Sequence, residues 1–218
     1  MPQIRAVLFD FGLVLSGPPD PIAMRRMETI LNTTHSELSA AYWRHRDDYD
    51  LGVLNGVSFW QTVGAELGRS PNEIELAQLL EADVELWTQP NQPMIDWAAA
   101  LQSTGVSTGI LSNMGDAMES GIVARFPWIA GFRHCTFSHN LGIAKPDERI
   151  YRHAIAAIAE PAAETLFIDD RIENIEAARA VGLQAIQYTS HEEFLREFHK
   201  ANFAGLPLPT APTTSSRP

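Results

Sequence analysis

Apolar stretches of this 218-residue sequence end at four places in side chains that could do chemistry. The four places are Asp10, Ser112 with Asn113, the turn before Lys145, and Asp169 with Asp170. An ionised carboxylate at the end of a buried stretch is costly unless something pairs with it. Three carboxylates close together would also raise one another's pKa, and a divalent cation bound between them reverses that cost.

An all-oxygen site of this kind suits Mg²⁺, which usually keeps several waters and often binds a phosphate oxygen. Lys145 adds a positive charge, Ser112 adds a hydroxyl donor, and the amides at the start of the next helix offer an anion site. Together these groups indicate phosphoryl transfer through an aspartyl-phosphate. Each group alone also fits a structural role: a strand-end Asp bound by amides, an acid pair at a helix start, a strand-exit turn, a solvated lysine.

The order of strands and helices must bring these groups together. From residue 90 onward, strand and helix patterns alternate with short connections, which predicts a parallel sheet with helices on both faces. The expected strands are residues 5–10, 107–113, 135–142 (with an exit turn), 165–170 and 183–188, and the expected helices are 94–105, 116–127, 147–160 and 174–182. The carboxyl ends of such strands share one edge, where ligands bind. The fold class is therefore α/β, with a Rossmann-like parallel sheet core.

Between the first strand and about residue 87 the pattern is helical throughout, which indicates an inserted helical subdomain. Asp20 is an expected N-cap followed by proline, and Thr34 with Glu37 has the spacing of a capping box. A further helix is expected to start at Ser70-Pro71. The predicted organisation is a core of residues 1–16 and 88–200, a helical cap of residues 17–87, and a mobile tail of residues 201–218, which is rich in Pro, Thr and Ser.

Composition narrows the functional classes. The chain is 45% hydrophobic and 20% charged, as expected for a globular protein with a sizeable core, and its net charge of −11 argues against binding to nucleic acid. The single cysteine excludes an internal disulfide and suits a reducing compartment. There is no secretory signal pattern and no apolar run near the ~20 residues that span a bilayer. We therefore expect a soluble, cytoplasmic protein without membrane partners; its oligomeric state stays open.

Four motifs in order resemble those of the haloacid dehalogenase-like (HAD) hydrolase superfamily. They are "FDFGLVL" (9–15), "ILSN" (110–113), "LGIAKPDERIY" (141–151) and "FIDDRIENIEAA" (167–178). The helical segment after the first motif resembles the cap of subfamily I, and "YDLGVLNGVSFW" (49–60) is similar to a stretch common in such caps. The resemblance covers about residues 4–190. It implies the HAD fold and a phosphatase acting on a small phosphorylated metabolite with Mg²⁺ as cofactor.

The resemblance also implies roles for individual residues at the phosphate. Asp10 would be the nucleophile. Ser112 and the Asn113 amide would hold the oxygens of the transferring phosphoryl group. Lys145 would orient Asp10 and neutralise the phosphate.

The same resemblance implies metal ligands at three places in the chain. The second oxygen of Asp10 and the backbone carbonyl of Gly12 would be ligands. Asp170 would be the other carboxylate ligand, with Asp169 as a further candidate that supports it, through water or directly. Asn174 takes the place of a further acid and would act one layer behind the metal.

Gly12 departs from the family pattern, because many HAD phosphatases carry there a second Asp that protonates the leaving group and then activates water. Such acid–base help is worth about 10²–10⁴-fold. Without it, good leaving groups should suffer least, as in anomeric sugar phosphates, acyl phosphates or aryl phosphates, unless a cap residue or metal-polarised water substitutes. One alternative is a 2-haloacid dehalogenase, which usually has an aromatic residue at that position and no metal, so the Asp169-Asp170 pair favours the phosphatase. The other is a catalytically silent binding or regulatory module.

The cap residues carry weaker signals. In "YWRHRDDYD" (42–50), Arg44 and Asp48 have the spacing of a surface ion pair on a helix. A substrate-facing role for Arg44, His45 or Arg46 is the less favoured interpretation. Residues expected to be structural are Phe59 and Trp60, in the core of the cap, and His134 and His139.

Overall fold

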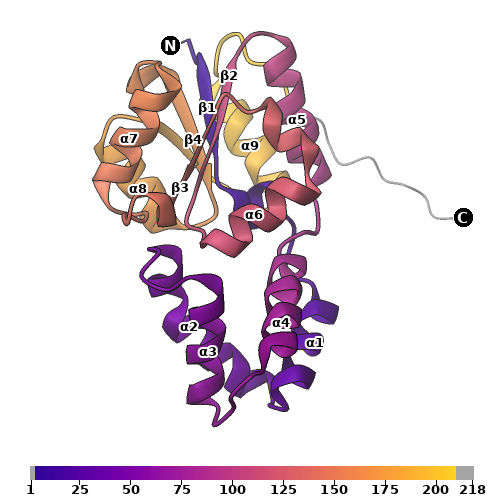
Figure 1. The fold of residues 1–218 in the computed structure, drawn as a ribbon. Helices are drawn as coiled ribbons and strands as arrows, with labels where there is room; N and C mark the ends of the chain where they lie inside the picture. Colours follow the sequence, from indigo (N-terminus) through magenta and orange to yellow (C-terminus); the bar gives the residue numbers. More distant parts are fainter. Residues whose placement is uncertain (1–2, 210–218) are drawn as a thin grey trace, which may run out of the picture.

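The computed structural model describes residues 3–209, in which a parallel sheet lies between two layers of helices and a helical lobe lies beyond one edge of the sheet (Figure 1). The strands are β1 (Ala6–Phe9), β2 (Ser107–Ser112), β3 (His134–Phe137), β4 (Thr165–Asp169) and β5 (Gln184–Gln187). Their order is β3-β2-β1-β4-β5, and all four pairings are parallel. The α/β class with a Rossmann-like sheet is confirmed.

The central strand β1 is apolar because both of its faces are covered. Val7 and Phe9 belong to the same apolar cluster as residues of helices α5, α6 and α9, whereas Ala6 and Leu8 belong to the cluster of α7 and α8. These helices are α5 (Gln92–Ser103), α6 (Asp116–Arg125), α7 (Glu148–Ile158), α8 (Ile172–Ala180) and α9 (His191–Ala201), and the short helical turns are η1 (Phe11–Leu15), η2 (Pro127–Gly131), η3 (Ser138–Asn140) and η4 (Ala162–Glu164). Within residues 3–209, no helix is long and apolar enough to cross a membrane.

The helical lobe, called the cap below, has an apolar core of its own. It consists of α1 (Pro21–Leu31), α2 (His35–Asp50), α3 (Gly56–Glu66) and α4 (Glu73–Leu86) (Figure 1). Phe59 and Trp60 are fully buried in this core, as predicted. The expected caps also form: Asp20 accepts a hydrogen bond from the amide of Ile22, and Thr34 and Glu37 bond reciprocally.

The cap is held on the core at the turn between α2 and α3. The Tyr49 hydroxyl accepts a hydrogen bond from the Met118 amide (3.3 Å), and the Tyr49 ring lies against Gly115 so closely that a Cβ at position 115 would overlap it. Gly52 has a positive φ of 72°, and a Cβ there would lie 2.7 Å from the carbonyl oxygen of His139. These contacts fix the C-terminal end of α2 over the ends of β2 and β3.

Some local predictions were wrong. The helix expected to start at Ser70-Pro71 is capped by Asn72 instead, because the Asn72 side chain accepts bonds from the amides of the first turn. Helix α9, which was not predicted, buries Phe194 and Phe198 against the Trp97 ring.

The expected mobile tail includes residues that contact the core. Ala204 pairs with Gln3 in an isolated bridge, Leu206 is buried, and the Pro207 carbonyl accepts a hydrogen bond from the Trp97 indole (2.8 Å). The segment up to residue 209 is therefore part of the packed structure. The remainder of the predicted tail, residues 210–218, lies outside the described residues.

Candidate active site

A cavity of about 330 Å³ lies where the carboxyl ends of the central strands face the cap. The structure brings all but one of the predicted site residues to its wall, and the exception, Asp169, is buried directly behind it. The core side of the wall comprises Asp10, Phe11, Gly12, Leu13, Ser112, Asn113, Met114, Met118, Lys145, Asp170, Arg171 and Asn174, and the cap side, with Trp87 at its C-terminal boundary, comprises Trp43, Arg46, Asp47, Asp50 and Trp87.

Register explains why residues so far apart in sequence meet here. Phe9 of β1 pairs with Ile110 of β2 and with Ile168 of β4, so Asp10, which directly follows β1, lies at the level of Asp169. The Asp10 amide donates to the Ile168 carbonyl (2.8 Å), which continues the ladder by one step. The sheet edge therefore presents the carboxylates of two neighbouring strands side by side.

Lys145 is the charge centre of the site. Its Nζ lies 3.0 Å from Asp10 Oδ1 and 2.6 Å from Asp169 Oδ2, and it donates to the Leu111 carbonyl at 2.9 Å. The side chain is only 1% exposed. The Asn113 side chain holds the backbone of Lys145 on both sides, because Oδ1 accepts from the Lys145 amide (2.8 Å) and Nδ2 donates to its carbonyl (2.9 Å).

Asp10 is a buried carboxylate in an unfavourable charge environment. Burial raises its pKa to about 7; Lys145 lowers it, and the neighbouring Asp169 and Asp170 raise it. Asp10 Oδ1 also accepts from the amide of Phe11 (2.7 Å), which turns the chain away from β1. Additional positive charge near a carboxyl group placed in this way would favour its ionised form at neutral pH.

The three acids are close enough to share a cation. One carboxylate oxygen from each of Asp10, Asp169 and Asp170 lies within 4.8 Å of the others. Both oxygens of Asp169 are occupied, by Lys145 (2.6 Å), the Arg171 amide (2.8 Å) and the Asn174 side chain (3.0 and 3.1 Å). By contrast, no other residue within 3–209 donates a hydrogen bond to the Asp170 carboxylate, whose pKa is raised by burial and by Asp169. Asp170 is thus the better placed of the pair to bind an ion directly.

Asn174 supplies a further sign of a missing partner. Its Nδ2 donates to Asp169, but its Oδ1 is buried and has no hydrogen-bond partner among the described residues. Buried polar atoms are almost always bonded to protein or ordered water. Together with the three acids, this oxygen fits a site for a hydrated hard cation such as Mg²⁺.

Gly12 is not required by the backbone. Its φ is −61°, which any residue adopts, and the nearest atom to a Cβ placed there would be in the Trp87 ring at 3.9 Å. A Cβ would therefore be accommodated at this position without displacing a neighbour. The absence of a second acid is a chemical property of this chain rather than a steric necessity.

The cap wall of the cavity contains Arg46, whose substrate-facing role was the less favoured interpretation, and Asp50, which the sequence did not single out. Arg46 and Asp50 are buried there, and Arg46 Nε donates to Asp50 Oδ1 at 2.7 Å. Arg44 does not pair with Asp48, as its spacing had suggested; Arg44 and His45 both bind Glu66 of α3 and lie outside the cavity wall. No spacing rule indicates Asp50, because its place in the wall depends on how α2 docks on the core.

His134, the first residue of β3, and His139 of η3 lie outside the cavity wall, in keeping with the structural roles expected for them. His139 Nε2 lies 2.5 Å from Glu119, on α6, so the pair links η3 to that helix. Burial lowers the pKa of His134, which packs beside His153.

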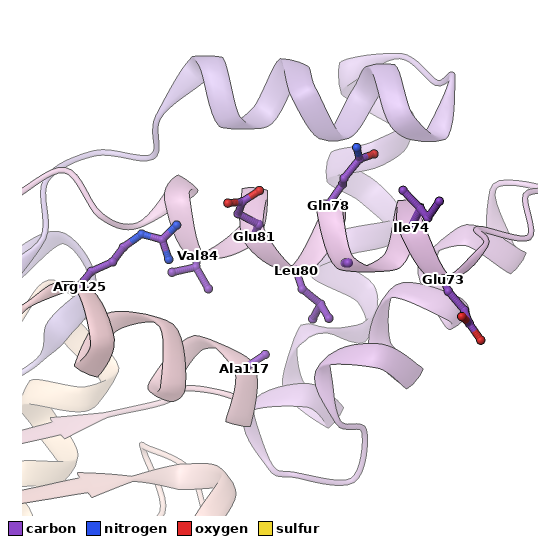
Figure 2. A pocket seen from close by; sticks show the side chains of 9 residues that line it. Glu73, Ile74, Gln78, Leu80, Glu81, Val84, Ala117 and Arg125 are labelled. Carbon is purple, nitrogen blue, oxygen red and sulfur yellow. The ribbon is translucent and has the colours of Figure 1, made fainter.

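A second hollow, of about 710 Å³, lies between α4 and α6 (Figure 2). Leu80 and Val84 of α4 face Ala117 of α6, and the charged side chains Arg125 and Glu73 lie at opposite ends with Glu81 between them (Figure 2). This groove contains neither the acid cluster nor a buried lysine. Its lining gives it no comparable chemistry.

Comparison with known proteins yields one family model and several relatives. The model described as haloacid dehalogenase-like hydrolase matches residues 19–182. The sesquiterpene phosphatase astK of Aspergillus oryzae is 46% identical over 190 residues, which cover 85% of this chain and 90% of that protein. Bifunctional epoxide hydrolase 2 of Sus scrofa is 27% identical over 235 residues, covering 99% of this chain, but the chain spans only 42% of the length of that relative.

Solved structures with the same fold include the HAD family enzyme bt-2542 from Bacteroides thetaiotaomicron. It superposes with a TM-score of 0.76 at 18% identity, over 90% of this chain and 98% of that one. The same enzyme in complex with magnesium and inorganic phosphate gives a TM-score of 0.73 at 19% identity, over 89% and 99% of the two chains. At this identity the likeness establishes a shared fold.

Proposed function

Because the chain belongs to the haloacid dehalogenase-like hydrolase family, we propose that it is a Mg²⁺-dependent phosphatase that hydrolyses a small phosphate monoester through an aspartyl-phosphate on Asp10. The observation that carries the proposal is the ion cluster at the cavity. A buried lysine contacts two of three carboxylates there, and those carboxylates converge within 4.8 Å. The 46% identity to a sesquiterpene phosphatase supports the same chemistry.

In the proposed reaction, an oxygen of the Asp10 carboxylate attacks phosphorus and the ester oxygen leaves on the opposite side. Lys145 holds Asp10 in place and offsets the charge of the phosphoryl group. The Ser112 hydroxyl and the Asn113 amide hold its oxygens; the Asn113 side chain is already engaged with Lys145, so the backbone N–H is the donor left for substrate. Water then attacks phosphorus, and phosphate and the Asp10 carboxylate are released.

Mg²⁺ would be held by Asp10, Asp170 and the carbonyl of Gly12, with Asp169 and Asn174 supporting them. When bound, the ion supplies charge that keeps Asp10 ionised and neutralises the phosphate. This role is supported by the raised pKa of Asp10, whose burial and acidic neighbours outweigh the effect of Lys145. It is also supported by the unpartnered Oδ1 of Asn174.

The substrate is proposed to carry an apolar organic group on its phosphate. Six apolar side chains line the cavity around the polar cluster: Phe11, Leu13, Trp43, Trp87, Met114 and Met118. A cavity of about 330 Å³ lies at the lower end of the range for small-ligand sites. The sesquiterpene phosphatase relative acts, by its name, on a compound of apolar character, and an anomeric sugar phosphate is the alternative that the leaving-group argument at Gly12 supports.

The test is phosphate release from an aryl phosphate, an apolar alkyl phosphate and an anomeric sugar phosphate, each with Mg²⁺ or EDTA. We expect turnover with Mg²⁺ but not with EDTA, and faster turnover of the aryl and alkyl phosphates than of the sugar phosphate. Asp10→Asn should abolish turnover. Asp48→Asn, on the exposed face of α2, is the matched control and should be unaffected. Turnover that survives both EDTA and Asp10→Asn would overturn the mechanism. Halide release from a 2-haloacid without metal would instead establish a dehalogenase.

A further inference from the structure

Asp50 is a buried carboxylate of the cavity wall that has no role in the reaction steps described above. It is the last residue of α2 and is 9% exposed, and it lines the same cavity as Asp10 and Lys145. The core side of the cavity lacks an acid for the leaving group, because position 12 is glycine. The cap wall of the cavity thus has a carboxylate without an assigned role, and the core wall lacks the acid that would protonate the leaving group.

The backbone of Asp50 is tied to the core beside the phosphate-binding residues. Ser138, which directly follows β3 and is fully buried, donates its hydroxyl proton to the Asp50 carbonyl and accepts a hydrogen bond from the Met114 amide (2.9 Å). Met114 directly follows Ser112 and Asn113. Asp50 therefore keeps a defined position relative to the end of β2, although it belongs to the cap.

The Asp50 side chain is held at one oxygen only. Arg46 Nε donates to Oδ1 at 2.7 Å, while Oδ2 has no hydrogen-bond partner within residues 3–209. The other charged groups around it are Asp47 on its own helix, Asp83 of α4 and Lys145 of the core. Burial raises the pKa of Asp50, and Arg46 and Lys145 oppose that effect. A carboxyl group fixed at one oxygen and open at the other is suited to exchange a proton with a ligand.

The position of Asp50 also matches the side of phosphorus on which the leaving oxygen must lie. In an in-line displacement on Asp10 the leaving oxygen lies on the far side of phosphorus from the nucleophile, and the attacking water later approaches from that same side. Asp10 follows the end of β1, so the far side is the one that the cap covers. Asp50 belongs to the cap side of the wall.

We propose that Asp50 is the general acid and base of this enzyme, supplied by the cap in place of the acid that Gly12 cannot provide; the assignment rests on the proposed phosphatase function. In the first step an Asp10 oxygen bonds to phosphorus as the bond between phosphorus and the leaving oxygen breaks, and the leaving oxygen takes the proton from Asp50. In the second step Asp50 takes a proton from water as the water oxygen bonds to phosphorus and the bond to Asp10 breaks. Asp50 ends protonated and Asp10 ends as a carboxylate, as both began.

The test compares kcat/KM for an alkyl and an aryl phosphate in wild type, Asp50→Asn, Gly12→Asp and the double variant, all with Mg²⁺. Asp50→Asn should lower the alkyl value by about 10²–10⁴-fold and the aryl value much less, because an aryl oxide leaves without a proton. The alkaline limb of the alkyl pH profile should disappear in the same variant. Gly12→Asp should raise the alkyl-to-aryl ratio more in the Asp50→Asn background than in wild type.

Two controls separate catalysis from structure. Asp48→Asn, an exposed acid on the same helix that lies outside the cavity wall, should leave the ratio unchanged. Asp50→Glu keeps a titratable group that can accept a hydrogen bond from Arg46, so it should retain the alkaline limb. This variant provides the test if Asp50→Asn does not fold. Equal losses on both esters, or an unchanged alkaline limb, would overturn the role of Asp50 while leaving the phosphatase intact. Absence of Mg²⁺-dependent turnover of either ester in wild type would overturn both.

Discussion

Replacing Lys145 by methionine tests whether one buried charge holds the acid cluster together. Lys145 Nζ lies 3.0 Å from Asp10 and 2.6 Å from Asp169, and the side chain is 1% exposed. Methionine keeps an unbranched apolar stem but leaves two buried carboxylates without their shared cation. Because removing one partner of a buried ion pair costs about 3–5 kcal/mol, we expect the free energy of unfolding to fall by that amount at pH 8 without divalent cations.

The loss should depend on pH in a defined direction. The pKa of Asp10 is already raised to about 7, against a usual value of 3.8, and without Lys145 it rises further. A carboxyl group whose pKa is higher in the folded state contributes stability at low pH, and this contribution is lost as the pH rises through the folded-state pKa. Each further unit by which the pKa of Asp10 rises adds about 1.4 kcal/mol to that loss of stability. The deficit of Lys145→Met should therefore be smaller at pH 5 than at pH 8, by on the order of 1–2 kcal/mol.

Urea unfolding followed by circular dichroism, at pH 5 and pH 8 in EDTA, measures both quantities. Lys200→Met is the control, since Lys200 is 74% exposed and its loss should change stability by less than about 0.5 kcal/mol. A deficit below about 1 kcal/mol at pH 8, or the same deficit at both pH values, would refute charge compensation by Lys145.

Two further predictions concern the cap and the cation site. Asp83 of α4 accepts a hydrogen bond from the Tyr42 hydroxyl (2.8 Å), and burial raises its pKa to about 6. The free energy of unfolding of the wild type should therefore fall by about 3 kcal/mol between pH 4 and 6 through this group. Asp83→Asn should lack that part of the decline in urea unfolding, and a decline as steep as in wild type would contradict the assignment. Asn174→Ala removes a donor to Asp169 and should weaken Mg²⁺ binding about 10–100-fold by isothermal titration calorimetry. Asn140→Ala, outside the cavity, serves as its control, and equal affinities for the two variants would count against a cation site at Asn174.

The sequence predicted the core well because its signals are local. An apolar run with no polar alternation indicates a strand covered on both faces, and parallel strands bring their carboxyl ends to one edge whatever lies between them. Asp10, Ser112 and Lys145 could therefore be grouped without knowledge of the distances. The caps at Asp20 and Thr34 were predictable for the same reason, since each involves only three or four neighbouring residues.

Local signals failed where tertiary contacts compete. The spacing of Arg44 and Asp48 suits an ion pair on one helix, but Glu66 of the neighbouring α3 binds Arg44 instead. The segment after α9 has a composition typical of disorder, yet Leu206 is buried and Pro207 accepts a bond from the Trp97 indole. In both cases the partner is far away in the sequence.

The sequence by itself determined the fold class and the grouping of the acids with Lys145, because the positions of strands and of their carboxyl ends follow from periodicity. It also raised the question of Gly12. Only the tertiary structure decided that position 12 has room for a side chain and that Asp50 faces the same cavity. The physical reason is that docking of α2 depends on contacts of Tyr49 and Gly52 with residues some 70 to 90 positions later, and no periodic pattern records such contacts.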